Sequence, residues 1–140
     1  MRLKMTNRKI CLTDLRGFAV GAVVLMASPV LADPSLECSV TTSSQVETAE
    51  CLIAEEERVG QALEAAIRVR QRAAEQIDNV TERELAIPAL AVSQEAWLAY
   101  RDAECNFKGT LFAGGSGGGI AIRSCRVQMT RDRIDALLDF

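Results

Sequence analysis

Cysteines are the residues of this chain with the greatest chemical reactivity, and there are five: Cys11, Cys38, Cys51, Cys105 and Cys125. No two of them have the C-x-x-C spacing that redox and zinc sites use, and the chain contains no histidine. Widely spaced cysteines form structural disulfides when a protein reaches an oxidising compartment. The cysteines therefore indicate disulfides rather than metal binding or thiol chemistry.

Other catalytic arrangements are difficult to assemble from this sequence. An activated nucleophile usually needs a neighbouring histidine, and paired carboxylates that cleave glycosides need a deep cleft. Residues 114–119 are rich in glycine, but they lack the Gly-Lys-Ser/Thr ending of a phosphate-binding loop, so we interpret them as a flexible connection. We therefore expect no enzyme activity, no cofactor and no metal.

The densest pattern lies between residues 94 and 105. Gln94, Trp97, Arg101 and Cys105 follow one another at helical spacing and form a stripe on one side of a helix. One interpretation is a recognition edge in which Trp97 stacks with Arg101. The other is a scaffold in which the aromatic side chains fill the core and Arg101 ties helices together. We favour the scaffold because the chain has only one Trp and one Tyr.

Residues 1–32 have the three parts of a secretory signal. Basic residues come first, an apolar run covers residues 17–27, and Val30 and Ala32 occupy the −3 and −1 positions. The run is too short to span a bilayer comfortably, which disfavours an uncleaved anchor, and no cysteine directly follows the cleavage motif. We predict a signal peptide cleaved near Ala32 and a mature domain of residues 33–140, periplasmic or secreted, without a membrane anchor.

Cleavage would change the charge of the protein. The whole chain carries 19 acidic and 16 basic residues, of which one acid and five bases lie in residues 1–32. The mature part would keep 18 acids and 11 bases, a formal charge of −7. Such a charge disfavours nucleic acid and anionic membranes as partners and favours basic ones.

The spacing of apolar residues predicts an all-α domain, a small antiparallel bundle of about three helices. We expect an irregular segment over residues 33–44 and helices from Gln45 to about Asn79, from Glu82 to about Phe107, and from Ile120 to Leu138. The inward side chains of the last helix are predicted to be Ile122, Val127, Thr130, Ile134, Leu137 and Leu138.

The middle helix has a start signal of its own. Thr81 and Glu84 predict a capping box, with Val80 and Leu85 as its hydrophobic staple. Pro88 would then lie inside this helix and kink it. The predicted apolar face of the helix comprises Leu85, Ala89, Val92, Ala96, Tyr100 and Ala103.

Antiparallel helices bring Cys51, Cys105 and Cys125 to one pole of the bundle, within reach of Cys38. Geometry leaves all three pairings open. We favour Cys38–Cys51 and Cys105–Cys125 because they close the shortest loops, and each bridge should stabilise the fold by roughly 3 kcal/mol.

Two stretches of sequence together resemble the LprI-like lysozyme-inhibitor domain family. The first is Gln94-x-x-Trp97-Leu98-x-Tyr100-Arg101-Asp102-x-Glu104-Cys105, and the second, after the glycine-rich stretch, is Cys125-x4-Thr130-x-x-Arg133-x3-Leu137. Cys38 and Cys51 ahead of a long helix agree with the resemblance, which covers nearly all of the mature chain. It implies an exported, helical, disulfide-containing bacterial domain.

The resemblance also implies a function, which is binding to a lysozyme or another envelope protein, with inhibition of lysozyme as its sharpest form. The alternative is an accessory domain that binds another envelope component without inhibiting anything. The motif residues are candidates for a binding edge or a scaffold: Gln94, Trp97, Tyr100, Arg101, Asp102, Thr130 and Arg133. The only evident protruding element is the Lys108–Gly119 loop, which carries no acid. The sequence leaves the partner and the oligomeric state open.

Overall fold

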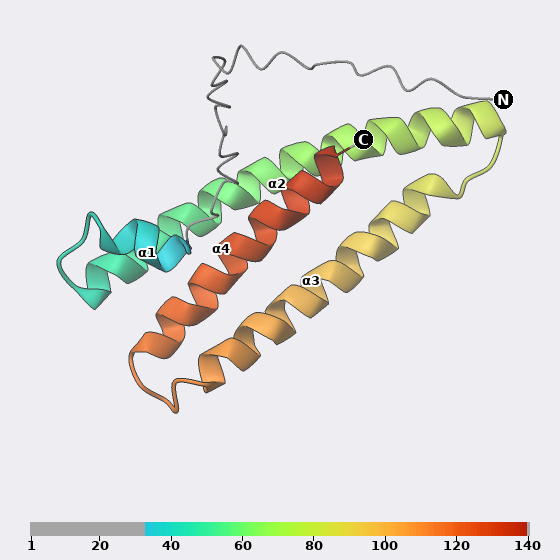
Figure 1. Ribbon diagram of the computed structural model, residues 1–140. Helices are drawn as coiled ribbons and strands as arrows, with labels where there is room; N and C mark the ends of the chain where they lie inside the picture. The colour runs from blue at the N-terminus through green and yellow to red at the C-terminus, as the bar shows by residue number, and fades with distance from the viewer. Residues whose placement is uncertain (1–32, 140) are drawn as a thin grey trace, which may run out of the picture. The chain divides into compact units, whose positions relative to one another are not determined.

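A computed structural model describes residues 33–139, which fold into four α-helices (Figure 1). The helices are α1 (Pro34–Ser39), α2 (Gln45–Thr81), α3 (Ala86–Thr110) and α4 (Gly117–Leu138). The predicted all-α class is confirmed. The predicted signal peptide lies outside the described residues. Within residues 33–139, no helix combines the length and the apolar character that a membrane span requires.

The segment before α2 is not irregular, as the sequence predicted, because it contains α1. A carboxylate oxygen of Asp33 accepts a hydrogen bond from the Ser35 backbone N–H at 2.8 Å and so caps the helix. Pro34 occupies the first helical position, where its fixed φ suits a helix and its missing N–H breaks no intrahelical bond. A six-residue helix is too short for apolar periodicity to reveal.

The connection between α2 and α3 also differs from the prediction. The carboxylate of Asp78 accepts hydrogen bonds from the backbone N–H groups of Leu85, Ala86 and Ile87 at 2.8–3.1 Å, so Asp78 caps α3 from within α2. Thr81 remains helical and donates its hydroxyl to the Ile77 carbonyl, so the predicted capping box does not form. The start of α3 consequently shifts to Ala86.

Pro88 is therefore the third residue of α3 and not an interior one. In the first turn of a helix the backbone N–H has no intrahelical partner, so a proline there removes no hydrogen bond. The prediction that Pro88 falls inside the helix and kinks it was wrong for this reason.

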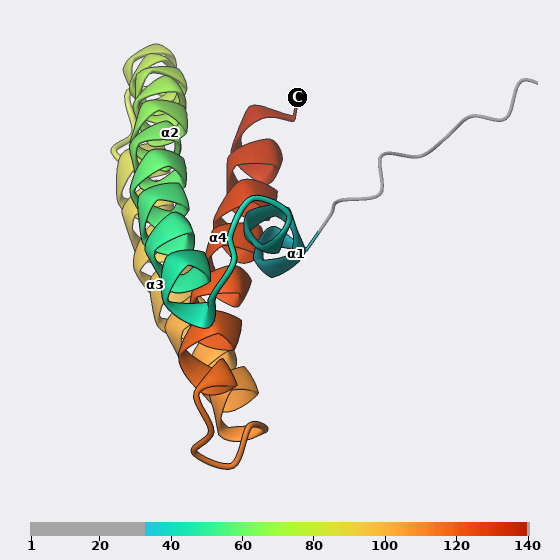
Figure 2. The ribbon, with the colours of Figure 1, turned by 90° about the vertical axis from the view of Figure 1, so that its left-hand side faces the viewer.

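α4 packs against each of the other three helices (Figure 2). Val127, Thr130 and Leu137 are buried as predicted, Ile122 and Ile134 are half-buried, and Leu138 is exposed. The core joins Leu63, Ala66 and Leu137, and the partly buried side chains around them are Ile67, Leu90, Trp97 and Ile134. This core holds α2, α3 and α4 together.

The glycine-rich stretch is a tight turn followed by the first residues of α4 rather than a long flexible loop. A Cβ atom at Gly109 would lie 2.6 Å from the Ile122 side chain, and one at Gly117 would lie 2.8 Å from the Phe112 ring. Gly114 has φ of +80°, in the left-handed region that glycine adopts without strain. These glycines let α3 and α4 approach closely on either side of the turn.

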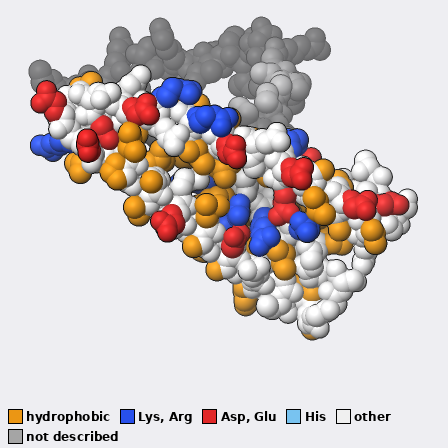
Figure 3. All heavy atoms as spheres, turned by 180° about the vertical axis from the view of Figure 1, so that it is seen from behind, with side chains coloured by type: hydrophobic (Ala, Val, Ile, Leu, Met, Phe, Trp, Pro, Cys, Tyr) orange, Lys and Arg blue, Asp and Glu red, His pale blue; other side chains and the backbone are white. Residues whose placement is uncertain are grey.

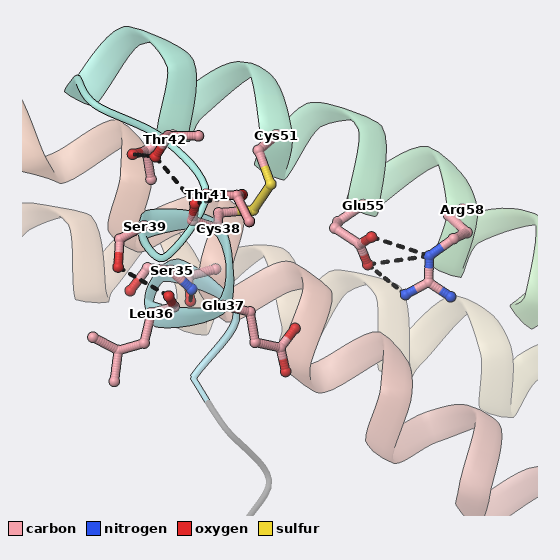
Figure 4. The surroundings of a disulfide bond; sticks show 12 residues. Ser35, Leu36, Glu37, Cys38, Ser39, Thr41, Thr42, Cys51, Glu55 and Arg58 are labelled. Carbon is pink, nitrogen blue, oxygen red and sulfur yellow. Dashed lines mark hydrogen bonds and ion pairs between the residues drawn. A yellow bond between two sulfur atoms is a disulfide. The ribbon is translucent and has the colours of Figure 1, made fainter.

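Both predicted disulfides are present. Cys38 pairs with Cys51, with 5.8 Å between their Cα atoms, and Cys105 pairs with Cys125, with 5.5 Å. The first bridge fixes α1 to the start of α2 (Figure 4). The second fixes the end of α3 to the start of α4, so two of the three connections between the helices have a covalent tie.

Candidate functional site

The predicted motif residues of α3 and α4 meet along the interface between these two helices. The Arg133 Nε donates to the Gln94 side-chain oxygen at 2.7 Å, and a terminal nitrogen of Arg133 donates to the Ser93 hydroxyl at 2.9 Å. The guanidinium carbons of Arg101 and Arg133 lie 5.2 and 5.8 Å from the centroid of the Trp97 ring. Both guanidinium groups are therefore in cation–π range of Trp97, whose side chain is half-buried.

Asp102 extends the same interface toward the disulfide end of the helices. It pairs with Arg101 of its own helix at 3.0 Å and with Arg126 of α4 at 3.4 Å. Thr130 is buried, and its hydroxyl donates to the Arg126 carbonyl at 2.7 Å. Six of the seven motif residues therefore lie where α3 joins α4.

Tyr100 is the exception among the motif residues. Its side chain is 60% exposed. The remaining motif residues make contacts along the interface between α3 and α4, and the guanidinium groups among them are engaged by neighbours within the protein.

A second set of ion pairs joins α1, α2 and α4. Arg131 of α4 pairs with Glu37 of α1 at 2.8 Å and with Glu55 of α2 at 3.2 Å. The carboxylate of Glu55 also accepts hydrogen bonds from Arg58, and chiefly because of them its pKa lies below its usual range (Figure 4). The Glu37 carboxylate, in turn, raises the pKa of Arg131. Sequence spacing gave no signal for these long-range pairs.

Most of the unpaired charges that remain on the surface are acidic. Arg123 pairs with Glu56, so most arginines of the described chain are engaged with its own groups. Among the described residues, the exposed acids for which the structure shows no ion pair are Asp33, Glu47, Glu50, Glu57, Glu75, Glu82, Glu84, Glu95, Asp132, Asp135 and Asp139. The exposed bases without one are Arg72, Arg83 and Lys108. Carboxylates thus dominate the charge that faces solvent.

The turn between α2 and α3 projects beyond α4. Arg70 of α2 donates to the carbonyl of Leu137 and therefore lies level with the end of α4. From Arg70, α2 continues to Thr81, roughly 16 Å further at 1.5 Å per residue (Figure 1). We call residues 77–87 the hairpin tip. The sequence offered no direct signal for this projection, because it depends on where α4 ends relative to α2.

The hairpin tip is held by hydrogen bonds of Asp78, exposes large apolar side chains and is charged at its apex. Its fixed geometry comes from Asp78, whose pKa is lowered by the backbone N–H groups of α3, that of Ala86 above all. Val80 is 85% exposed and Leu85 63% exposed, although both are large apolar residues. Arg83 is exposed between Glu82 and Glu84, and Glu82 adopts a left-handed conformation that closes α2. A convex element of this kind can enter a groove on another molecule.

An open groove of about 780 Å³ lies where the start of α1 meets the turn between α3 and α4. Lys108, Phe112 and Gln128 contribute to its lining. Its single carboxylate, Asp33, has a lowered pKa because it accepts hydrogen bonds from Ser124 first and from Ser35 second. A carboxylate held ionised in this way suits helix capping, and the groove offers no second carboxylate for acid–base chemistry.

No cluster of three or more acidic, cysteine or histidine side chains suited to a metal ion occurs among residues 33–139.

Comparison with known proteins gives one match. A sequence model of the family described as Lysozyme inhibitor LprI matches residues 37–137, a range that contains the four paired cysteines and the whole α3–α4 motif. No curated protein and no solved structure matches the chain.

Proposed function

The chain belongs to the lysozyme inhibitor LprI family, and from this premise we propose that it is an exported protein that binds and inhibits a lysozyme by direct protein contact. Family membership is the observation that carries the proposal. Export is supported by the signal-like residues 1–32 and by two disulfides, which form and persist in oxidising compartments.

The surface charge supports a basic partner. Lysozymes are typically basic proteins, and the carboxylates of this chain face solvent while most of its arginines are engaged internally. Opposite charges on two proteins accelerate their encounter, and salt screens this effect. We therefore expect inhibition to weaken as ionic strength rises.

The hairpin tip supplies the element that blocks the enzyme. Inhibition requires a convex part that covers or enters the sugar-binding cleft, and the cleavage site of most glycosidases contains two carboxylates. Arg83 at the apex of the tip offers a guanidinium that can pair with carboxylates, and Val80 adds apolar contact area. We therefore take the tip, and not the Lys108–Gly119 loop, as the candidate inhibitory element.

The test is a lysozyme assay on cell-wall substrate, with protein recovered from the periplasm of cells that express the full chain. We expect inhibition at micromolar excess over the enzyme at low salt and several-fold weaker inhibition at high salt. Absence of inhibition at tens of micromolar and low salt would contradict the proposed function.

Two variants locate the contact. Arg83→Ala removes the cation at the apex of the tip. Arg72→Ala is the control, because Arg72 lies on α2 and is also an exposed cation for which the structure shows no ion pair. We expect Arg83→Ala to weaken inhibition about ten-fold and Arg72→Ala to leave it unchanged. Equal inhibition by both variants and the wild type would exclude the tip while leaving the family function standing.

A further inference from the structure

The side of α3 that faces away from the protein is apolar along its whole length. The residues predicted from sequence to face the core, Leu85, Ala89, Val92, Ala96, Tyr100 and Ala103, are all exposed. The side chains that face inward are instead those of Leu90, Gln94, Trp97, Arg101 and Cys105, and of these only Cys105 is fully buried. An apolar pattern typical of a buried helix face therefore lies in solvent.

We define the outer face of α3 as Leu85, Ala89, Val92, Ala96, Ala99, Tyr100, Ala103 and Phe107, all of them exposed. Leu85, Val92, Tyr100 and Phe107 are between 59% and 65% exposed. Hydrophobic side chains follow the length of α3 in the space-filling view (Figure 3). Contiguous apolar patches of several hundred Å² on soluble proteins commonly mark contact sites with other proteins.

Charge identifies the kind of partner that fits this face. The only exposed charged residues of α3 are Glu95 and Lys108, whereas exposed positions of α2 include Glu50, Glu57, Glu64, Arg68, Arg72 and Glu75. A basic partner would gain little from an uncharged surface. Two copies of an acidic protein repel each other, and the outer face of α3 is where they can meet with the fewest opposed carboxylates.

The spacing on this face indicates that the partner is another helix. Leu85, Val92 and Ala99 recur every seven residues, and so do Ala89, Ala96 and Ala103. Two interleaved seven-residue repeats are the pattern by which one helix packs along another in a left-handed supercoil. Alanine at every position of the second repeat allows the two backbones to approach closely, with Tyr100 and Phe107 covering the sides.

The available area matches a stable dimer. α3 has 25 residues, so its outer face is roughly 37 Å long at 1.5 Å per residue. Its exposed side chains offer on the order of 600 Å² per copy, or about 1,200 Å² in total, which reaches the lower end of specific interfaces.

We propose that the outer face of α3 is a homodimer interface, occupied by α3 of a second copy of this chain. A two-fold pairing uses the same surface on both copies, so one apolar face satisfies both. This face shares only Leu85 with the hairpin tip, and the positions substituted below, Val92 and Ala96, lie outside the tip.

The test is sedimentation equilibrium of the protein recovered from the periplasm, from about 1 to 100 µM, with Val92→Glu compared against Val46→Glu. Val46 is the matched control because it is 68% exposed, against 65% for Val92, and lies on α2. We expect the wild type and Val46→Glu to form dimers. The dimer dissociation constant of Val92→Glu should be at least ten-fold higher than that of the wild type, with helix content and disulfides unchanged.

Ala96→Glu provides a second charge on the same face and should also give a monomer. A wild-type protein that stays monomeric up to 100 µM would overturn the proposal. So would a dimer that survives both α3 substitutions, or one that Val46→Glu disrupts as strongly as Val92→Glu does.

Discussion

Replacing Trp97 with alanine separates the two roles that the α3–α4 motif could have. Trp97 packs against the core formed by Leu63, Ala66 and Leu137, and Arg101 and Arg133 lie over its ring. If the motif is a scaffold, the substitution should reduce the stability of the fold. If the motif is a recognition edge, the substitution should reduce binding to the partner and leave the stability of the fold nearly unchanged.

The expected loss of stability can be worked out from these contacts. Replacing a core Trp with Ala costs about 3–5 kcal/mol, and half-burial of Trp97 places it at or below the lower end of that range. Two cation–π contacts add about 0.5–1 kcal/mol each. We therefore expect Trp97→Ala to lower the free energy of unfolding by about 3 kcal/mol.

The assay is urea unfolding followed by circular dichroism at the helix band, because Trp97 is the only tryptophan and the variant loses its fluorescence. Tyr100→Ala is the control on the same helix, since Tyr100 is 60% exposed and should change stability by less than about 0.5 kcal/mol. Both variants are measured at a protein concentration of about 1 µM, so that dimerisation contributes little to the measured stability.

The scaffold interpretation also predicts that folded Trp97→Ala still inhibits lysozyme at low temperature. A stability loss below about 1 kcal/mol together with lost inhibition would refute the reasoning and make Trp97 a recognition anchor.

Three further predictions concern the joints of the fold. Replacing Cys105 and Cys125 together by serine should lower the free energy of unfolding by about 3 kcal/mol in urea titrations, because their bridge closes a loop of 20-residue separation. The pKa of Asp78 is depressed in the folded state, so the stabilisation by its carboxylate is present above the usual value of 3.8 and is lost as pH falls through the folded-state pKa. Amide exchange at the start of α3, relative to its intrinsic rate at each pH, should therefore accelerate below about pH 4. In Asp78→Ala the same amides should exchange fast at neutral pH. Gly109→Ala should cost about 1–3 kcal/mol in thermal unfolding because its Cβ would meet Ile122 at 2.6 Å, whereas Gly119→Ala, with nothing within 4 Å, should be neutral or stabilising.

The sequence predicted the fold class and the disulfides because both depend on short-range information. Apolar spacing along α2 matches its buried stripe, which includes Leu52, Val59 and Leu63. The two bridges join cysteines that are close in sequence, so loop length alone selected the correct pairing. Membership of the family followed from an ordered motif rather than from composition.

The orientation of α3 could not be predicted in this way. This helix is apolar around most of its circumference, so periodicity selected the strictest apolar stripe, which contains Val92 and Ala96, as the core face. The actual inward stripe contains Gln94 and Arg101, which pair with polar groups on α4 that sequence spacing does not reveal. Such a conflict between local pattern and tertiary structure is expected where a surface has a function.

The start of α3 was missed for a related reason. Thr81 and Glu84 have the spacing of a capping box, but Asp78 lies one turn earlier and reaches three backbone N–H groups of the next helix. A carboxylate that makes three such bonds outcompetes a hydroxyl that makes one. The position of the hairpin tip relative to α4 is marked by the Arg70–Leu137 contact, which joins residues 67 positions apart in the sequence.

Intact mass of the protein recovered from cells that express the full chain, measured without reduction, tests the central claim most directly. Access to a lysozyme and formation of the disulfides both require that the chain leaves the cytoplasm. We predict a periplasmic or secreted product that begins at Asp33 and has all four remaining cysteines oxidised in two pairs. A cytosolic product that retains residues 1–32 and free thiols would contradict the account.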